Sequence, residues 1–162
     1  PNIYAVGDVT GKMPLAHVAS AQAILAVETI AGIESPLLEY NKLPRATYCS
    51  PQVTSFGYTE AQARNEGLDI AVGRFPLRAN GKALAMAESE GLVKIIADNK
   101  TGAILGAHLI GPEVTEILPE IIATQLLNGT TQELASLVHS HPSLSETIKE
   151  AAMAVFNRSI HI

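Results

Sequence analysis

Apolar and polar positions recur along the first part of the chain with two different spacings. Residues 3–6 form a short apolar run typical of a buried strand, which ends at Gly7-Asp8. Residues 15–31 are rich in alanine, repeat with helical spacing and stop at a glycine. We therefore predict a strand, a loop and a helix within residues 1–42, which end in a proline-containing linker.

Beyond residue 42 the pattern changes to short β-rich runs, and most of the helical repeats follow them. Asp98 to Gly102 is typical of a hairpin turn with glycine at a left-handed position. Hairpin connections and strands that precede helices predict an α+β domain, an antiparallel sheet with helices packed on it, over residues 43–162. The predicted strands are 45–49, 53–58, 70–78, 92–97 and 103–110, and the predicted helices are 59–66, 80–86, 113–128, a short segment capped by Thr130, and 143–157.

Composition narrows the class of protein. The 162 residues are 47% hydrophobic, which indicates a soluble globular protein with a real core. A formal net charge of −5 argues against nucleic acid as a main partner, because phosphate binding needs clustered lysine and arginine. No apolar run is long enough to span a bilayer, so we expect no membrane partner.

The cysteine count indicates the state of the thiol, and the first residues indicate whether the chain is part of a longer protein. A single cysteine excludes an intrachain disulfide, and we expect Cys49 to be buried and inert in a reducing, cytoplasmic compartment. The chain opens on Pro1-Asn2 without an initiator methionine, and the apolar run at 3–6 needs strand neighbours on both sides. We therefore expect the chain to be the C-terminal part of a longer protein.

The segment from His139 to Glu146 holds the strongest candidate chemistry. Histidine is the side chain best suited to moving protons near neutral pH, and a carboxylate bonded to one ring nitrogen fixes its tautomer. His141 precedes a proline and has Glu146 five positions ahead. Glu146 also has a second interpretation, because Ser143 and Glu146 have the spacing of a capping box at the start of a helix.

The other histidines have weaker claims to chemistry. His139 could line the same pocket or could be a satisfied residue at a helix end, and we favour the second interpretation. His108 lies in a predicted strand and is expected to be structural, whereas His161 is expected to be frayed. No histidine, cysteine and carboxylate cluster has zinc-ligand spacing, so no metal site is predicted.

A second candidate site lies near the start of the chain, at Asp8 and at Pro14, Leu15, Ala16 and His17. Asp8 follows a predicted strand, where ligands of open α/β sheets lie, and its carboxylate can accept hydrogen bonds from sugar-like hydroxyls. Taken alone, Asp8 is more simply an ordinary turn aspartate. The other four residues open a helix, whose free N–H groups and positive dipole end can hold an electron-rich oxygen.

Together these segments resemble the pyridine nucleotide–disulfide oxidoreductases over nearly the whole chain. The run Tyr4-Ala5-Val6-Gly7-Asp8 resembles the second FAD fingerprint of that family. The paired histidines before a proline are most like its dihydrolipoamide dehydrogenase branch. The further matching motifs are Gly57-Tyr58-Thr59-Glu60 after Pro51, Gly102, Gly106 with Gly111-Pro112, and His139-x-His141-Pro142-x-Leu144-x-Glu146.

The resemblance implies an oxidoreductase that uses FAD, with NAD as co-substrate. It implies that Asp8 binds the ribityl chain, that residues 14–17 face the flavin ring with Ala16 offering a backbone N–H, and that His141 is the acid–base residue with Glu146 as its partner. The implied partners are a second copy of the chain, in a homodimer, and the lipoyl-bearing acyltransferase of a 2-oxo acid dehydrogenase complex.

Two alternatives remain open at this point. One is another member of the family, such as a glutathione or mercuric reductase; the other is a non-catalytic dimerisation module, which this segment would be in isolation. The sequence lacks the family's N-terminal Gly-x-Gly-x-x-Gly, its redox-active cysteine pair and its NAD-binding domain. We therefore expect the segment alone to be inactive, and we assign residues 1–42 to the end of an FAD-binding domain.

Overall fold

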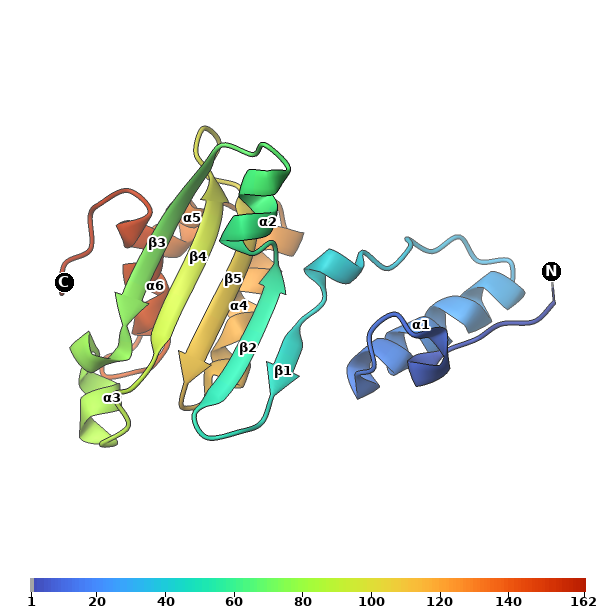
Figure 1. Cartoon of the computed structure of the whole chain (residues 1–162), viewed down its shortest axis with the longest axis horizontal. Helices are drawn as coiled ribbons and strands as arrows, with labels where there is room; N and C mark the ends of the chain where they lie inside the picture. The colour runs from blue at the N-terminus through green and yellow to red at the C-terminus, as the bar shows by residue number, and fades with distance from the viewer. Residues whose placement is uncertain (1) are drawn as a thin grey trace. The chain divides into compact units, whose positions relative to one another are not determined.

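In the computed structural model, which describes residues 2–162, the chain divides into two units, Pro1–Leu43 and Pro44–Ile162. The first unit has one long helix, α1 (Ala16–Ile30), and two short 3-10 turns, Gly7–Thr10 and Tyr40–Lys42 (Figure 1). The division falls next to the predicted boundary. The assignment of the first unit to an FAD-binding domain stays a prediction.

The predicted strand at residues 3–6 is wrong for this chain. These residues belong to no strand of the described chain, and the side chains of Ile3 and Tyr4 are exposed. An apolar run becomes a strand only when neighbouring strands satisfy its backbone groups, and the described part of the first unit contains none.

A buried glutamine holds the first unit together. The backbone N–H of Gly7 donates to Oε1 of Gln22 at 2.6 Å, and Nε2 of Gln22 donates to the hydroxyl of Tyr40 at 2.9 Å. Gln22 lies on α1 and is 7% exposed. Its side chain therefore ties the turn that carries Asp8 and the segment after α1 to one helix.

The second unit is a five-stranded antiparallel sheet with helices against it, which confirms the predicted α+β class (Figure 1). The strand order is β1-β2-β5-β4-β3. The strands are β1 (Arg45–Thr47), β2 (Gln52–Gly57), β3 (Ile70–Pro76), β4 (Leu92–Asp98) and β5 (Ile104–Gly111). The helices are α2 (Glu60–Asn65), α3 (Gly81–Ala85), α4 (Val114–Leu126), α5 (Thr131–Ser136) and α6 (Glu146–Ala154).

The core lies between the sheet and the helices that follow it in sequence. Helix α4 packs on β2 and β5, and α6 packs on β3 and β4, with α5 against α6 (Figure 1). Alternating strand residues such as Phe56, Phe75 and Ile95 meet Leu118 and Ile148 of the helices in one buried cluster. Burial of these side chains fixes the two helices on the same face of the sheet.

Helix α6 approaches the sheet closely because β3 has a glycine at the crossing point. A Cβ at Gly73 would lie 2.0 Å from the carbonyl oxygen of Ala151 and 2.7 Å from the backbone nitrogen of Val155. Only glycine leaves room for a backbone at this distance. Gly73 therefore sets the position of α6, whose first residue is Glu146.

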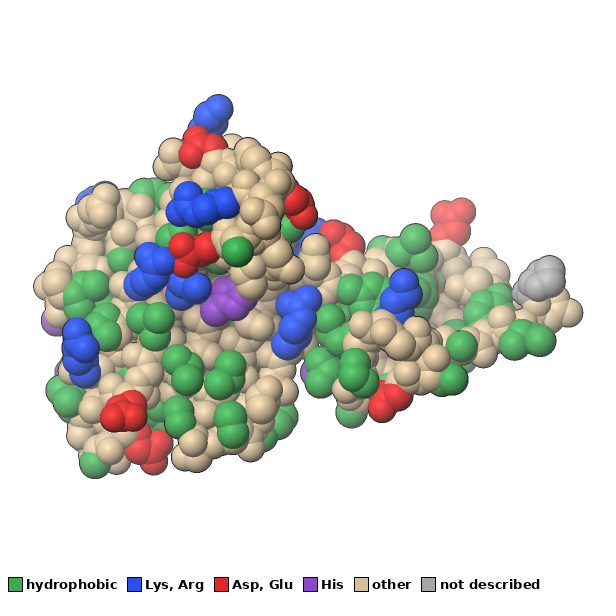
Figure 2. Space-filling model, viewed as in Figure 1, with side chains coloured by type: hydrophobic (Ala, Val, Ile, Leu, Met, Phe, Trp, Pro, Cys, Tyr) green, Lys and Arg blue, Asp and Glu red, His purple; other side chains and the backbone are tan. Residues whose placement is uncertain are grey.

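The opposite face of the sheet is divided into an apolar end and a charged middle (Figure 2). Glu60, at the start of α2, forms ion pairs with Arg74 and, at 3.2 Å, with Lys94. These two contacts hold α2 over the charged middle. The apolar row comprises the cross-strand neighbours Val53, Ile110, Leu92 and Pro76, and the next row comprises Ser55, His108, Lys94 and Arg74.

Cys49 is exposed, so the prediction of a buried thiol is wrong. The residue lies in the connection between β1 and β2. Such connections run over the surface, where no other element buries their side chains. Its Sγ donates a hydrogen bond to the carbonyl oxygen of Pro51 at 3.1 Å.

Candidate active site

The loop before α6 brings an imidazole and a carboxylate together. Nδ1 of His141 lies 2.9 Å from Oε1 of Glu146. An ionised carboxylate only accepts hydrogen bonds, so the ring donates through Nδ1–H and its Nε2 is left as the basic nitrogen. The His141 side chain is 76% exposed, which makes this nitrogen accessible. The His141–Pro142 peptide is cis.

Glu146 pairs with His141 and forms only half of the expected capping box. While Oε1 pairs with His141, Oε2 accepts the backbone N–H of Ser143 at 2.8 Å. The helix begins at Glu146 rather than at Ser143, and Ser145 is its cap residue without a side-chain cap bond. The carboxylate therefore holds the loop and orients the imidazole at the same time.

The surroundings of Glu146 favour its ionised form. Partial burial raises the pKa of this carboxyl, but the hydrogen bonds from Ser143 N–H and from His141, with the charges of His141 and His139, outweigh burial and lower the pKa below its usual value. A carboxylate that stays ionised can stabilise an imidazolium formed on His141.

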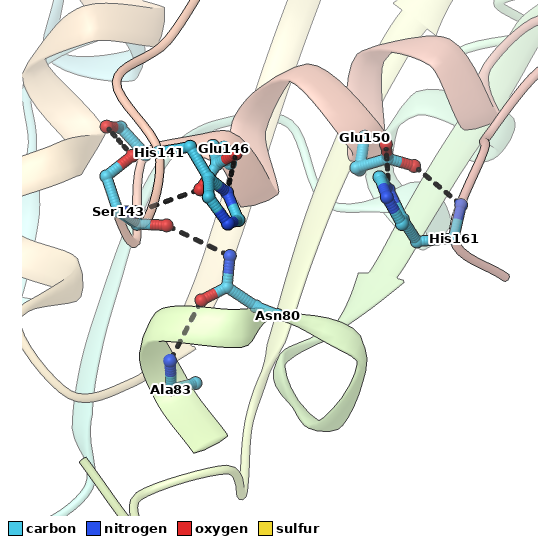
Figure 3. Close-up of polar contacts among 8 residues, drawn as sticks. Asn80, Ala83, His141, Ser143, Glu146, Glu150 and His161 are labelled. Atoms are coloured by element: carbon cyan, nitrogen blue, oxygen red, sulfur yellow. Dashed lines mark hydrogen bonds and ion pairs between the residues drawn. The ribbon is translucent and has the colours of Figure 1, made fainter. Parts of the chain in front are cut away.

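Asn80 supports the loop from a distant part of the chain, and no motif in the sequence points to this role. Its Nδ2 donates to the carbonyl oxygen of Ser143 at 3.0 Å, and its Oδ1 accepts the backbone N–H of Ala83 at 2.9 Å (Figure 3). The residue is buried and caps α3. An asparagine before a helical turn predicts the cap, but nothing local in the sequence predicts a contact 63 positions away.

A cavity of about 400 Å³ opens beside His141, between α3, α6 and the segment after α6. Its wall combines apolar side chains such as Leu84 and Ile160 with the polar groups Asn80 and Lys149. Small-molecule sites have this size and this mixture of apolar lining and few polar groups. The exposed imidazole is therefore placed at the wall of a ligand-sized space.

His139 is fixed to helix α4. Its Nε2 lies 2.9 Å from Oε1 of Glu120, and its side chain is 9% exposed. It lines the same cavity as His141. His139 therefore belongs to the pocket wall, and it is not the satisfied helix-end residue that we favoured, because it lies beyond the end of α5 and its Nδ1 is buried without a hydrogen-bond partner among the described residues.

Two other histidines have structural positions. His108 in β5 lies with Nε2 2.9 Å from the carbonyl oxygen of Tyr58, and burial lowers its pKa. His161 is not frayed, contrary to expectation, because its Nδ1 lies 2.8 Å from Oε1 of Glu150 (Figure 3). An expectation drawn from sequence position alone misses such an anchor.

The second candidate site lies within the first unit. Asp8 is exposed and sits on the 3-10 turn that packs against α1, not at the end of a strand. Leu15 is the cap residue of α1 and makes no side-chain cap bond; Pro14 precedes it, and Ala16 and His17 open the helix. The carboxylate and the uncapped helix start suit a ligand with hydroxyls and a carbonyl oxygen, as in the ribityl chain and ring of a flavin.

A metal-binding cluster and a membrane-spanning helix are both absent from the residues that the structure describes. In residues 2–162, no group of three or more histidine, cysteine and acidic side chains could hold a metal ion. No helix in this part of the chain has both the length and the apolar character needed to cross a membrane.

Residues 43–152 match the family described as "Pyridine nucleotide-disulphide oxidoreductase, dimerisation domain". The chain belongs to this family. Among curated members, dihydrolipoyl dehydrogenase of Corynebacterium glutamicum is 51% identical over 162 residues, covering 98% of this chain and 34% of the relative. The mitochondrial dihydrolipoyl dehydrogenase 1 of Arabidopsis thaliana is 41% identical over all of this chain and 32% of its own length. The chain thus spans about a third of such oxidoreductases.

Two solved structures have the same fold as this chain. LpdA from Mycobacterium tuberculosis superposes with a TM-score of 0.86 at 29% identity, over 93% of this chain and 33% of that protein. The HOCl-induced flavoprotein disulfide reductase RclA from Escherichia coli superposes with a TM-score of 0.85 at 28% identity, over 93% of this chain and 35% of that protein.

Proposed function

We propose that the chain is the C-terminal part of a dihydrolipoamide dehydrogenase, which oxidises dihydrolipoamide with NAD⁺ through FAD and a cysteine pair elsewhere in the protein. The observation that carries this proposal is the 2.9 Å contact between His141 Nδ1 and Glu146 Oε1, which leaves the second ring nitrogen exposed at a cavity. The relatives support the proposal, because this chain is 41–52% identical to curated dihydrolipoyl dehydrogenases.

The proposed role of His141 follows from the chemistry of dithiols. A thiol attacks a disulfide only as its thiolate, so a base must remove the proton first. Nε2 of His141 takes this proton, and Glu146 stabilises the resulting imidazolium through Nδ1. The same ring returns the proton when the exchange runs in the other direction.

The first unit supplies part of the proposed flavin site. The Asp8 carboxylate would accept hydrogen bonds from the ribityl hydroxyls, and the start of α1, at Pro14, Leu15, Ala16 and His17, would hold an electron-rich oxygen of the ring. When bound, FAD supplies an electron acceptor for the dithiol and a donor for NAD⁺. Residues 2–43 hold only one end of such a cofactor, so this chain alone is expected to lack activity.

The proposed partners are a second copy of the chain, the lipoyl-bearing acyltransferase of a 2-oxo acid dehydrogenase complex, and NAD as co-substrate. A homodimer agrees with the dimerisation domain in the family description and with exposed apolar side chains in the second unit, including Leu126, Leu127 and Val53. The proposed location is the cytoplasm, where a lone exposed thiol such as Cys49 stays reduced.

A second candidate function is reduction of another substrate, either glutathione disulfide or mercuric ion, as in the glutathione and mercuric reductases of the family. The structural likeness to a flavoprotein disulfide reductase at 28% identity favours it, but the identity to dihydrolipoyl dehydrogenases is higher.

Steady-state assays on the full-length, FAD-loaded protein discriminate between the two functions. We expect reduction of NAD⁺ by dihydrolipoamide at a kcat/KM at least about 10⁴ M⁻¹s⁻¹, the lower end of the usual range for a physiological substrate. Faster oxidation of NADPH with glutathione disulfide, or with mercuric ion, would overturn the proposal in favour of the alternative.

A further inference from the structure

Helix α6 carries a second carboxylate whose partners all lie in one short segment. Oε2 of Glu150 accepts the backbone N–H groups of Ile160 at 3.0 Å and His161 at 3.4 Å, and Oε1 lies 2.8 Å from Nδ1 of His161. The carbonyl oxygen of Glu150 also accepts the hydroxyl of Ser159 at 2.9 Å. One residue of α6 therefore fastens the segment 159–162 to the helix.

The carboxylate and the segment depend on each other. The Glu150 side chain is 7% exposed, and a buried charge is costly unless hydrogen bonds replace its lost water. Every hydrogen bond that the described residues give this carboxylate comes from Ile160 and His161. Release of the segment would leave the charge without a donor, so the segment is held more firmly than its exposed position suggests.

This anchor lies one helical turn from the proposed acid–base pair. Glu146 and Glu150 are four positions apart and therefore lie on the same side of α6, and Figure 3 shows both histidine–glutamate pairs along that side. Ile160 and His161 line the same cavity as His141. The anchored segment is thus a wall of the space in which His141 is placed.

We propose that Glu150 is a positioning residue: it holds the segment 159–162 as a wall of the cavity beside His141 and so sets how tightly a dithiol substrate is bound there. This inference rests on the proposed function, since it concerns substrate binding at the same site. Glu150 takes no part in proton transfer. Its loss should therefore change KM and leave the pH dependence of kcat unaltered.

The test uses the full-length, FAD-loaded enzyme with the variants Glu150→Gln and His161→Ala. Hydrogen exchange followed by mass spectrometry on a peptide covering residues 156–162 reports whether the segment is released. We expect Glu150→Gln to accelerate this exchange roughly tenfold, the change expected for losing a hydrogen bond to a charged group. His161→Ala removes an exposed side chain without threatening the fold, and it should give a smaller acceleration. Glu116→Gln on α4 is the charge-matched control.

Kinetics with dihydrolipoamide complete the test. We expect KM to rise by roughly tenfold in Glu150→Gln, with the pH profile of kcat unchanged. Unchanged exchange in both variants would overturn the anchor, and faster exchange with an unchanged KM would overturn its role at the cavity. A shifted kcat profile would also overturn it, because Glu150 would then act on the proton. If the wild-type enzyme does not oxidise dihydrolipoamide, the proposed function fails. The hydrogen exchange of residues 156–162 then decides by itself whether Glu150 anchors the segment 159–162.

Discussion

At the scale of single residues, Glu146 joins two tasks in one side chain. One oxygen orients His141 and the other accepts the Ser143 N–H at the start of α6. Asn80 then holds the same loop through the carbonyl of Ser143. The sequence predicted both tasks of Glu146 as alternatives, because each has its own spacing rule. It could not predict the support from Asn80, which depends on how the start of α3 and the loop before α6 meet in the fold.

Glu146→Gln should lower stability by about 1 kcal/mol at pH 7, the usual cost of a lost helix-end contact. The pKa of Glu146 is lowered in the folded chain, so its stabilisation is fully present above the unfolded value of 4.5 and is lost as the pH falls through the folded value. The stability difference between the variant and the wild type should therefore shrink toward pH 3. Urea unfolding at several pH values measures it, and a difference that grows on acidification would contradict the lowered pKa.

At the scale of elements, the sequence predicted the strands and helices of residues 43–162 to within a few residues. Turn and cap residues gave local signals, such as the hairpin turn from Asp98 to Gly102 and the cap at Thr130. The failures at residues 3–6 and at Cys49 share one cause. Burial depends on packing partners that are distant in sequence. An apolar run or a cysteine indicates only that burial would be favourable, not that such partners exist.

Thr59→Ala should destabilise the second unit by about 1 kcal/mol, since it removes the hydroxyl that accepts the Gln62 N–H at the start of α2. Thr59→Ser keeps the hydroxyl and is the matched control. Chemical denaturation compares the two variants. Equal stability of Thr59→Ala and Thr59→Ser would mean that the capping box contributes nothing.

Gly73→Ala should destabilise the second unit by at least about 2 kcal/mol, the cost of overpacking a rigid contact. The added Cβ meets the backbone of α6 at Ala151 and cannot be relieved by a side-chain rotation. Gly81→Ala is the control, because a Cβ there meets only His141, at 3.8 Å. A melting temperature of Gly73→Ala equal to that of the control would refute the close packing of α6 on β3.

At the scale of the whole molecule, the second unit exposes apolar side chains that a single copy does not cover. Leu126 and Leu127 at the end of α4 are 73% and 81% exposed, and Val53 and Ile110 lie on the open face of the sheet. The two leucines end a helix on the other face of the sheet, so these side chains form two separate exposed groups, and exposed apolar groups of this kind mark surfaces that bind a partner. We expect a homodimer to cover the leucines at the end of α4.

The double variant Leu126→Gln, Leu127→Gln should weaken self-association at least about tenfold, since each buried leucine contributes about 1.5–3 kcal/mol. Both side chains are exposed, so the fold of one copy should be unchanged. Leu37→Gln, an equally exposed leucine in the first unit, is the control. Sedimentation equilibrium measures the dissociation constants, and equal values for all three proteins would exclude the end of α4 from the interface.

The central claim is that His141 moves the proton at the dithiol centre. The most direct measurement is the turnover of His141→Gln with dihydrolipoamide and NAD⁺, made on full-length dimer whose FAD content equals that of the wild type. The side chain is 76% exposed, so the fold should be unaffected, and we expect turnover to fall by about a hundredfold or more, as for other positioned acid–base groups. His108→Gln, which removes an imidazole outside the cavity, should keep its turnover. Near-wild-type turnover of His141→Gln in an intact, FAD-loaded dimer would contradict the assignment of His141 as the acid–base residue.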